Sequence, residues 1–176
     1  MADFVDHEDS LSEDEDSKEG GYRHFNDSND TSFAISLFDL SLDLIQLPNA
    51  STELALGHGA VVWEAAVIFC KYLEYGQAIK ELSSMDKLAG KRVLELGSGT
   101  GLAGMALMLK GCKVTFTDLQ PVVEHITVPN VNKVYKHCMS NGNTTNGGVT
   151  MYEPVVYPID WTGTDTPSLP LPTPYM

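Results

Sequence analysis

The residues of this chain that could do chemistry are concentrated in one glycine-rich stretch. Residues 92–96 (RVLEL) are typical of a short strand, and GSGTGLAG follows them directly, with four glycines in eight residues. Glycines at a strand-to-helix turn let the backbone approach a ligand and leave N–H groups free at the start of the helix. Because so many glycines are conformationally costly without a close approach to explain them, we expect a binding turn for a nucleotide-like cofactor.

Two registers of this turn compete. Gly99, Gly101 and Gly104 match the dinucleotide fingerprint GxGxxG. Glu95, with glycines at 97, 99 and 101, matches the ExGxGxG motif of class I methyltransferases. A carboxylate at the strand end would repel a pyrophosphate but favour the sulfonium and ammonium groups of S-adenosylmethionine. The methyltransferase register is therefore favoured, also because Gly97 begins the turn where the strand ends, and NAD binding remains the alternative.

An acidic residue ends the next expected strand. Residues 113–117 (KVTFT) form that strand, and Asp118 closes it, 19 residues after Gly99. A carboxylate at this position can accept hydrogen bonds from both ribose hydroxyls of either cofactor. The competing interpretation is that Asp118 caps the following helix.

Hydrophobic periodicity predicts the helices that flank these strands. A helix follows Gly57-His58-Gly59 and ends near Gly76, and a second helix covers 102–110. Weaker helical patterns cover about 82–88 and 121–139, the latter with an interruption at Pro129. One face of the first helix carries Val62, Ala65, Ala66, Phe69, Cys70 and Leu73.

The remaining strands are short. Apolar residues alternate over 33–37 and again, in the opposite phase, over 40–44, which predicts a bulge or a tight hairpin at Phe38–Asp39. Residues 149–159 predict a third sheet strand, at an edge because Pro154 and Pro158 weaken it. The strand–turn–helix–strand order indicates an α/β, Rossmann-like three-layer fold around a parallel sheet with a right-handed crossover, and with an N-terminal β-hairpin.

The composition of the chain excludes some classes of function. The net charge is −13, and residues 1–30 carry eleven acidic against two basic residues. We therefore expect a disordered acidic tail over 1–31 and one domain over 32–176, without the basic face that nucleic acid requires. The three cysteines lack the spacing of zinc ligands, which favours free thiols and no metal site. Neither a leader sequence nor a membrane-spanning run is evident, so we expect a cytoplasmic protein that can also enter the nucleus.

Several segments together resemble the protein-lysine methyltransferases of the methyltransferase-like 21 group. They are GAVVWEAA at 59–66, VLELGSGTGL at 93–102, VTFTD at 114–118 and the pair Asp160-Trp161, and the resemblance covers about 55–176. It implies a class I fold, S-adenosylmethionine as cofactor and a protein lysine as acceptor, in a chaperone or translation factor. It also implies that the two tryptophans contact the cofactor. The expected cofactor-binding residues are Trp63, Glu95, Gly97, Ser98, Gly99, Gly101, Asp118, Asp160 and Trp161; no catalytic residue is assigned.

The chain departs from that family at its end. The acid-x-x-Tyr motif that follows the family's fourth strand is missing, and Pro174-Tyr175-Met176 resembles the entry into that strand. We therefore expect a C-terminally truncated cofactor-binding half that does not transfer methyl groups by itself, with an open apolar edge on the strand at 92–96. The alternatives are a non-catalytic cofactor-binding or interaction module, such as a truncated isoform, and, less favoured, an NAD-dependent oxidoreductase.

Overall fold

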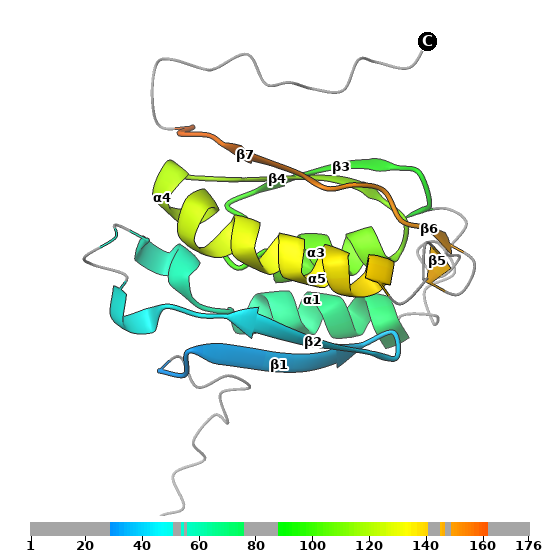
Figure 1. The fold of residues 1–176 in the computed structure, drawn as a ribbon, viewed down its shortest axis with the longest axis horizontal. Helices are drawn as coiled ribbons and strands as arrows, with labels where there is room; N and C mark the ends of the chain where they lie inside the picture. The colour runs from blue at the N-terminus through cyan, green and yellow to red at the C-terminus, as the bar shows by residue number, and fades with distance from the viewer. Residues whose placement is uncertain are drawn as a thin grey trace, which may run out of the picture.

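Three parallel strands form the sheet that the glycine motif predicts. In the computed structural model, β3 (Arg92–Leu96), β4 (Lys113–Asp118) and β7 (Val155–Pro158) lie in the order β3-β4-β7, and β4 pairs in parallel with both neighbours (Figure 1). The structure describes residues 29–50, 54, 56–75, 88–140, 145–146 and 149–161. Residues 1–28 of the predicted acidic tail, most of the weak helix near 82–88 and the segment after 161 lie outside these residues.

The predicted third strand is divided in two. Only Val155–Pro158 joins the sheet, at its edge as expected from the prolines, whereas β6 (Val149–Thr150) pairs with β5 (Thr145–Asn146). Pro154 has no N–H to donate to a ladder, and β7 begins directly after it. The strand is therefore shorter than the sequence pattern predicts.

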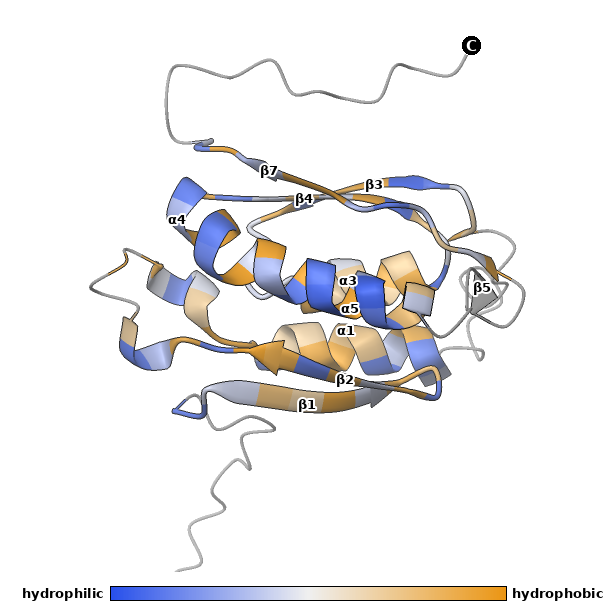
Figure 2. Ribbon diagram, viewed as in Figure 1, coloured by the Kyte–Doolittle hydropathy of each residue, from blue (hydrophilic) through white to orange (hydrophobic). Residues whose placement is uncertain are grey.

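The helices of the described residues lie on one face of this sheet. They are α1 (Glu64–Tyr75), α3 (Leu102–Leu109) and a continuous run of α4 (Gln120–Val122), η4 (Val123–Thr127) and α5 (Val128–Ser140), with two short 3₁₀ turns, η1 (Pro48–Ala50) and η2 (Gly57–Ala60). Most of α3 is buried and apolar because it packs between β4 and α1 (Figure 2). The two predicted helices flanking the glycine turn are thus confirmed.

The predicted interruption at Pro129 is wrong. The chain stays helical from Gln120 to Ser140, and residues Val123–Thr127 form a π-helical turn just before the proline. In a regular α-helix the proline ring would meet the carbonyl of His125, four residues earlier. The wider turn redirects the carbonyls of this segment, so the helix accommodates Pro129 without ending.

The N-terminal strands form the tight hairpin. β1 (Ser32–Leu37) and β2 (Leu40–Ile45) are antiparallel with Leu37 opposite Leu40. The two loop residues, Phe38 and Asp39, have φ values of 51° and 64°, which is the type I′ turn that suits the twist of a hairpin. The alternating apolar residues of both strands are buried against α1 and α5.

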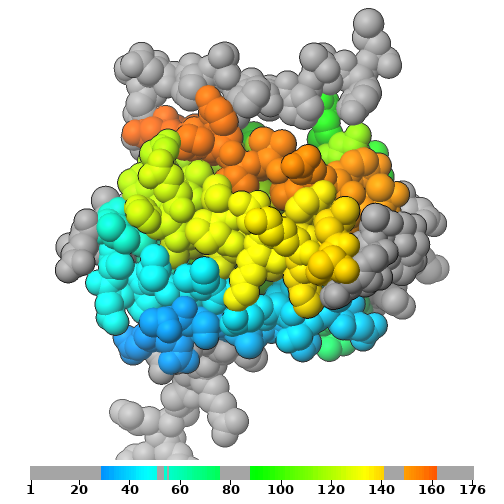
Figure 3. Space-filling view, in the orientation of Figure 1, coloured from blue at the N-terminus to red at the C-terminus, as the bar shows by residue number. Residues whose placement is uncertain are grey.

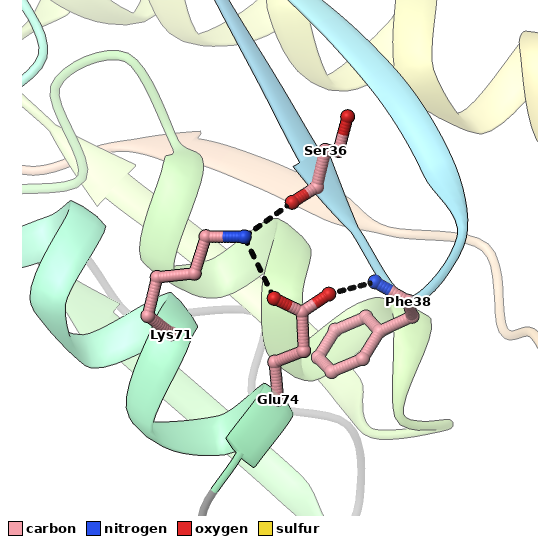
Figure 4. A network of polar contacts seen from close by, with 4 residues as sticks. All are labelled: Ser36, Phe38, Lys71 and Glu74. Atoms are coloured by element: carbon pink, nitrogen blue, oxygen red, sulfur yellow. Dashed lines mark hydrogen bonds and ion pairs between the residues drawn. The ribbon is translucent and has the colours of Figure 1, made fainter.

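Polar contacts from α1 hold the hairpin turn. Glu74 Oε1 accepts a 2.7 Å hydrogen bond from the Phe38 N–H, and Lys71 Nζ donates to Glu74 Oε2 at 2.7 Å and to the Ser36 carbonyl at 2.6 Å (Figure 4). Lys110 Nζ lies 4.1 Å from the centre of the Phe38 ring. These contacts help offset the left-handed backbone of Phe38, which costs a non-glycine residue about 1–2 kcal/mol.

On the other face of the sheet, β3 carries two exposed leucines. Leu94 is 42% exposed and Leu96 is 54% exposed, while Val93 and Glu95 alternate with them and are less exposed. Within the part of the chain that the structure describes, β3 pairs with β4 alone. Exposed apolar side chains on a strand that has one partner among the described residues favour self-association.

We expect the Leu94→Thr/Leu96→Thr double variant to self-associate less than the wild type. Threonine keeps the β-propensity of the strand while removing apolar surface. Static light scattering over a concentration series measures the effect. Ile68→Thr, which removes a similarly exposed apolar side chain from α1, is the control and should leave association unchanged. Equal scattering by the double variant and the wild type would show that this face does not drive association.

Candidate functional site

A cleft of about 750 Å³ lies at the carboxyl ends of β3 and β4. Its walls come from the 3₁₀ turn before α1, from α1 itself, from the glycine turn and from the start of α4. The volume is within the range of about 300–1,000 Å³ that small-molecule sites have, and the carboxyl end of a parallel sheet is where such ligands bind. The predicted residues that line it are Trp63, Glu95, Gly97, Ser98, Gly99, Asp118 and Trp161.

Two predicted residues lie outside the lining of this cleft. Gly101 sits at the start of α3 with φ +83°, and a Cβ there would come within 3.2 Å of Val131 and 3.3 Å of Met105. It is therefore a packing glycine that lets the helix begin close to its neighbours. Asp160 is exposed, and its neighbour Trp161 contributes to the cleft instead.

The glycine turn is shaped by left-handed residues. Gly97 and Gly99 have φ values of +65° and +51°, a region that only glycine enters readily. A Cβ on Gly99 would lie 3.3 Å from the carbonyl oxygen of Gly59, so the turn also packs closely against the 3₁₀ turn before α1. Two glycine-containing segments, 40 residues apart in sequence, thus form adjoining walls of the cleft.

Asp118 is bound to the glycine turn. Its Oδ2 accepts a 2.7 Å hydrogen bond from the Gly99 N–H, and its Oδ1 accepts one of 2.8 Å from the Leu119 N–H. Leu119 is the N-cap of α4, and the hydrogen bonds of Asp118 go to the Gly99 and Leu119 N–H groups rather than to the N–H groups of the first helical turn that a cap would bind. A carboxylate has about four acceptor positions, so two remain for a ligand.

Glu95 is the other carboxylate of the cleft. Its Oε1 accepts a 3.0 Å hydrogen bond from the Gly104 N–H on α3, while its Oε2 is buried without a hydrogen-bond partner. Burial raises the pKa of Glu95 to about 7, the Gly104 N–H opposes this shift, and the charge of Asp118 adds to it. A buried, unsatisfied carboxylate oxygen is costly in the free protein, and a cationic ligand in the neighbouring cleft would favour the charged form of Glu95.

We expect Glu95→Gln to remove part of the pH dependence of stability. The pKa of Glu95 is higher in the folded chain than its ordinary value of 4.5, so its contribution to stability is full below pH 4.5 and is lost as the pH rises through 7. Glutamine keeps an acceptor for the Gly104 N–H and does not titrate. Between pH 4.5 and 8, the free energy of unfolding of the variant should therefore rise relative to that of the wild type by up to about 3 kcal/mol, as measured by urea denaturation. If the stability of both proteins changed with pH in the same way, Glu95 would not have a raised pKa in the folded chain.

Aromatic residues stand at the mouth of the cleft. Trp63 and Trp161 are both more than half exposed, although they lie 98 residues apart in sequence. The indole Nε1 of Trp63 donates a 2.7 Å hydrogen bond to the His58 carbonyl, and the two rings meet edge to face with centroids 5.5 Å apart. His58 thus fixes the orientation of Trp63.

Sequence reasoning missed His58 and the apolar walls. The available signal for His58 was its position between Gly57 and Gly59, immediately before the segment that carries Trp63. Phe69 was expected on the buried face of α1, whereas it also lines the cleft, together with Leu119 and Val122.

The described residues offer little rival chemistry. Cys70, Cys112 and Cys138 are free and buried, as predicted, and burial followed by the charge of Glu95 raises the pKa of Cys70 to about 12. Its thiol is therefore protonated at neutral pH and a poor nucleophile. Over the ranges that the structure describes, no group of three or more His, Cys, Asp and Glu side chains could hold a metal ion. Within the same ranges, every helix is too short or too polar to cross a bilayer.

Comparison with known proteins identifies the family of this chain. Residues 44–145 match the model of a family described as lysine methyltransferase, which is more than half of the chain. The chain belongs to the lysine methyltransferase family. The matched residues include the hairpin end, α1, the glycine turn and Asp118.

Curated relatives fall in the same family. The chain is 49% identical over 72 residues to protein N-lysine methyltransferase METTL21A of Danio rerio, covering 41% of this chain and 29% of that protein. It is 42% identical over 71 residues to EEF1A lysine methyltransferase 3 of Mus musculus, covering 40% of this chain and 27% of that protein. It is 38% identical over 69 residues to protein-lysine methyltransferase METTL21E of Bos taurus, covering 39% of this chain and 22% of that protein. The matched segment thus spans less than a third of the length of each relative.

Proposed function

We propose that the cleft binds S-adenosylmethionine and that the chain is the cofactor-binding portion of a protein-lysine N-methyltransferase. The observation that carries this proposal is the pair of carboxylates, Glu95 and Asp118, at the ends of adjacent parallel strands on one cleft. S-adenosylmethionine has a sulfonium and an ammonium group and no phosphate, so it suits two acids. The pyrophosphate of NAD would be repelled by them.

Different residues of the cleft can bind different parts of the cofactor. Asp118 has acceptor positions left for the ribose hydroxyls, and the negative charge of Glu95 can stabilise the cationic amino-acid end. Trp63 and Trp161 offer aromatic faces for the adenine ring or for a positive charge. The left-handed turn at Gly97 and Gly99 lets the backbone approach without a Cβ in the way.

The bound cofactor would supply an electrophilic methyl group on its sulfonium. A lysine amine attacks such a group only when it is neutral, and removal of water lowers the pKa of an amine. The exposed indoles at the mouth can cover the aliphatic stem of an incoming lysine and exclude water from its amine. We propose a protein substrate with an accessible lysine, in the chaperone or translation-factor class that the resemblance implies, and a cytoplasmic location.

Calorimetry with S-adenosylmethionine, its demethylated product and NAD tests the cofactor. We expect heat of binding from the first two and none from NAD. Binding of NAD alone would replace the proposal with the oxidoreductase alternative.

A radiolabelled-methyl assay on cell extract tests the reaction. Transfer to protein lysines supports an enzyme. Cofactor binding without transfer to any protein supports the second candidate, a cofactor-binding module.

A further inference from the structure

The buried polar side chains of the described residues gather at and behind the cleft. Ser98 and Thr100 belong to the glycine turn and line the cleft, and the others bond to the turn, to β3 or to the segment that precedes Trp63. The whole set is Gln46, Ser98, Thr100, Thr117, Thr127 and Asn130. Buried polar groups are costly unless they are paired, so a cluster of them at one place indicates a fixed geometry that the fold specifies there.

Thr127 bonds to the same glycine of the turn as Asp118 does. It is the last residue of the π-helical turn and is fully buried, and its Oγ1 donates a 2.7 Å hydrogen bond to the Gly99 carbonyl. The N–H of the same glycine donates to Asp118 at 2.7 Å. Both polar groups of the left-handed Gly99 are therefore fixed by side chains from β4 and the π-helical turn.

Asn130 joins the glycine turn to the N-terminal hairpin. Its Nδ2 donates to the Thr100 carbonyl at 3.3 Å and to the Ile45 carbonyl at 3.0 Å, and its Oδ1 accepts from the Ile45 N–H at 2.7 Å. The amide is fully buried, and its paired bonds to Ile45 fix its orientation. Figure 3 shows α5 lying along the hairpin on the face in view, so this link is part of a larger contact.

The end of the hairpin also holds the opposite wall. Gln46 Oε1 accepts a 2.7 Å hydrogen bond from the Val62 N–H, and the Leu47 N–H donates to the Ala60 carbonyl at 2.9 Å. These bonds tie residues 46–47 to the segment that leads into Trp63. The hairpin end thus contacts one wall directly and the glycine turn through Asn130.

We propose that Thr127 and Asn130 are positioning residues that hold the glycine turn in its cofactor-binding form, and that Asn130 couples the N-terminal hairpin to cofactor binding. This inference rests on the proposed cofactor. A turn fixed before the ligand arrives loses less freedom on binding, so weakening these bonds costs affinity. Neither residue touches the cleft, and both act through the backbone of Gly99 and Thr100.

Variants of Thr127 test the first part. Thr127→Val keeps the shape but leaves the buried Gly99 carbonyl unsatisfied, so we expect about tenfold weaker binding of the demethylated cofactor by calorimetry. Thr127→Ser keeps the hydroxyl and should bind within about twofold of the wild type. Thr115→Val is the control, because the Thr115 hydroxyl makes no hydrogen bond within the described residues. A folded Thr127→Val protein with wild-type affinity would overturn the positioning role.

Amide exchange in the wild type tests the coupling even if a variant fails to fold. We expect saturating demethylated cofactor to slow exchange of the Ile45 N–H, which bonds to Asn130, more than that of the Phe38 N–H at the other end of the hairpin. A general gain in stability would slow both amides alike. Protection of the glycine turn with equal effects on Ile45 and Phe38 would overturn the coupling alone. No response anywhere in the chain would instead remove the proposed cofactor, and this inference with it.

Discussion

Replacing Asp118 with alanine is expected to weaken binding of S-adenosylmethionine by about 1–3 kcal/mol, roughly 5- to 150-fold in Kd. Two effects contribute to this loss. The variant removes a charged acceptor for the ribose hydroxyls, and it releases the Gly99 N–H that the carboxylate holds at 2.7 Å. Isothermal titration calorimetry on purified wild type and variant measures the difference.

Two further variants separate the charge from the loss of the side chain. Asp118→Asn keeps one acceptor for the Gly99 N–H and should recover part of the affinity. Asp43→Ala removes an exposed carboxylate on β2 that pairs with Lys133 at 2.6 Å, so it should leave cofactor binding unchanged. If Asp118→Ala bound the cofactor as tightly as the wild type, Asp118 would have no place in the site.

The strands and the glycine turn could be predicted because local chemistry determines them. β3 and β4 start and end where the pattern predicts, since Gly97 breaks one strand and Asp118 ends the other. The hairpin was predictable because a two-residue loop reverses the phase of apolar alternation, which the sequence shows at Phe38–Asp39. In all these cases the deciding residues lie within a few positions of each other.

The residues behind the cleft could not be found in this way. Thr127 and Asn130 belong to types that are usually exposed, and the partner of Asn130 on the hairpin is 85 residues away. Pro129 between them suggested a helix end, because nothing in the local sequence indicated the π-helical turn that accommodates it. Gly101 was assigned to the site because it belongs to the ExGxGxG motif, and such a motif does not distinguish a packing glycine from a lining glycine.

Gly104→Ala is expected to destabilise the chain, although alanine is the better helix former. Gly104 is a helical glycine on α3, and a methyl group there would overlap the fully buried ring of Phe116 and the Oε2 of Glu95. Overpacking of this kind costs about 1–3 kcal/mol, while the gain in helix propensity is about 1 kcal/mol. The net loss should appear as a lower urea midpoint with an unchanged slope.

The two overlaps predict separate signatures. Phe116→Leu makes room for the methyl group, so the double variant should be more stable than the sum of the single effects. The alanine also pushes the Glu95 carboxylate towards the cleft, which lowers its raised pKa of about 7 towards the ordinary value. Because burial of that carboxylate penalises the wild type as the pH rises through 7, relief of the penalty makes Gly104→Ala less destabilising at pH 8 than at pH 5. A stabilised variant, or a destabilisation independent of pH, would mean that Gly104 does not bring α3 against Glu95.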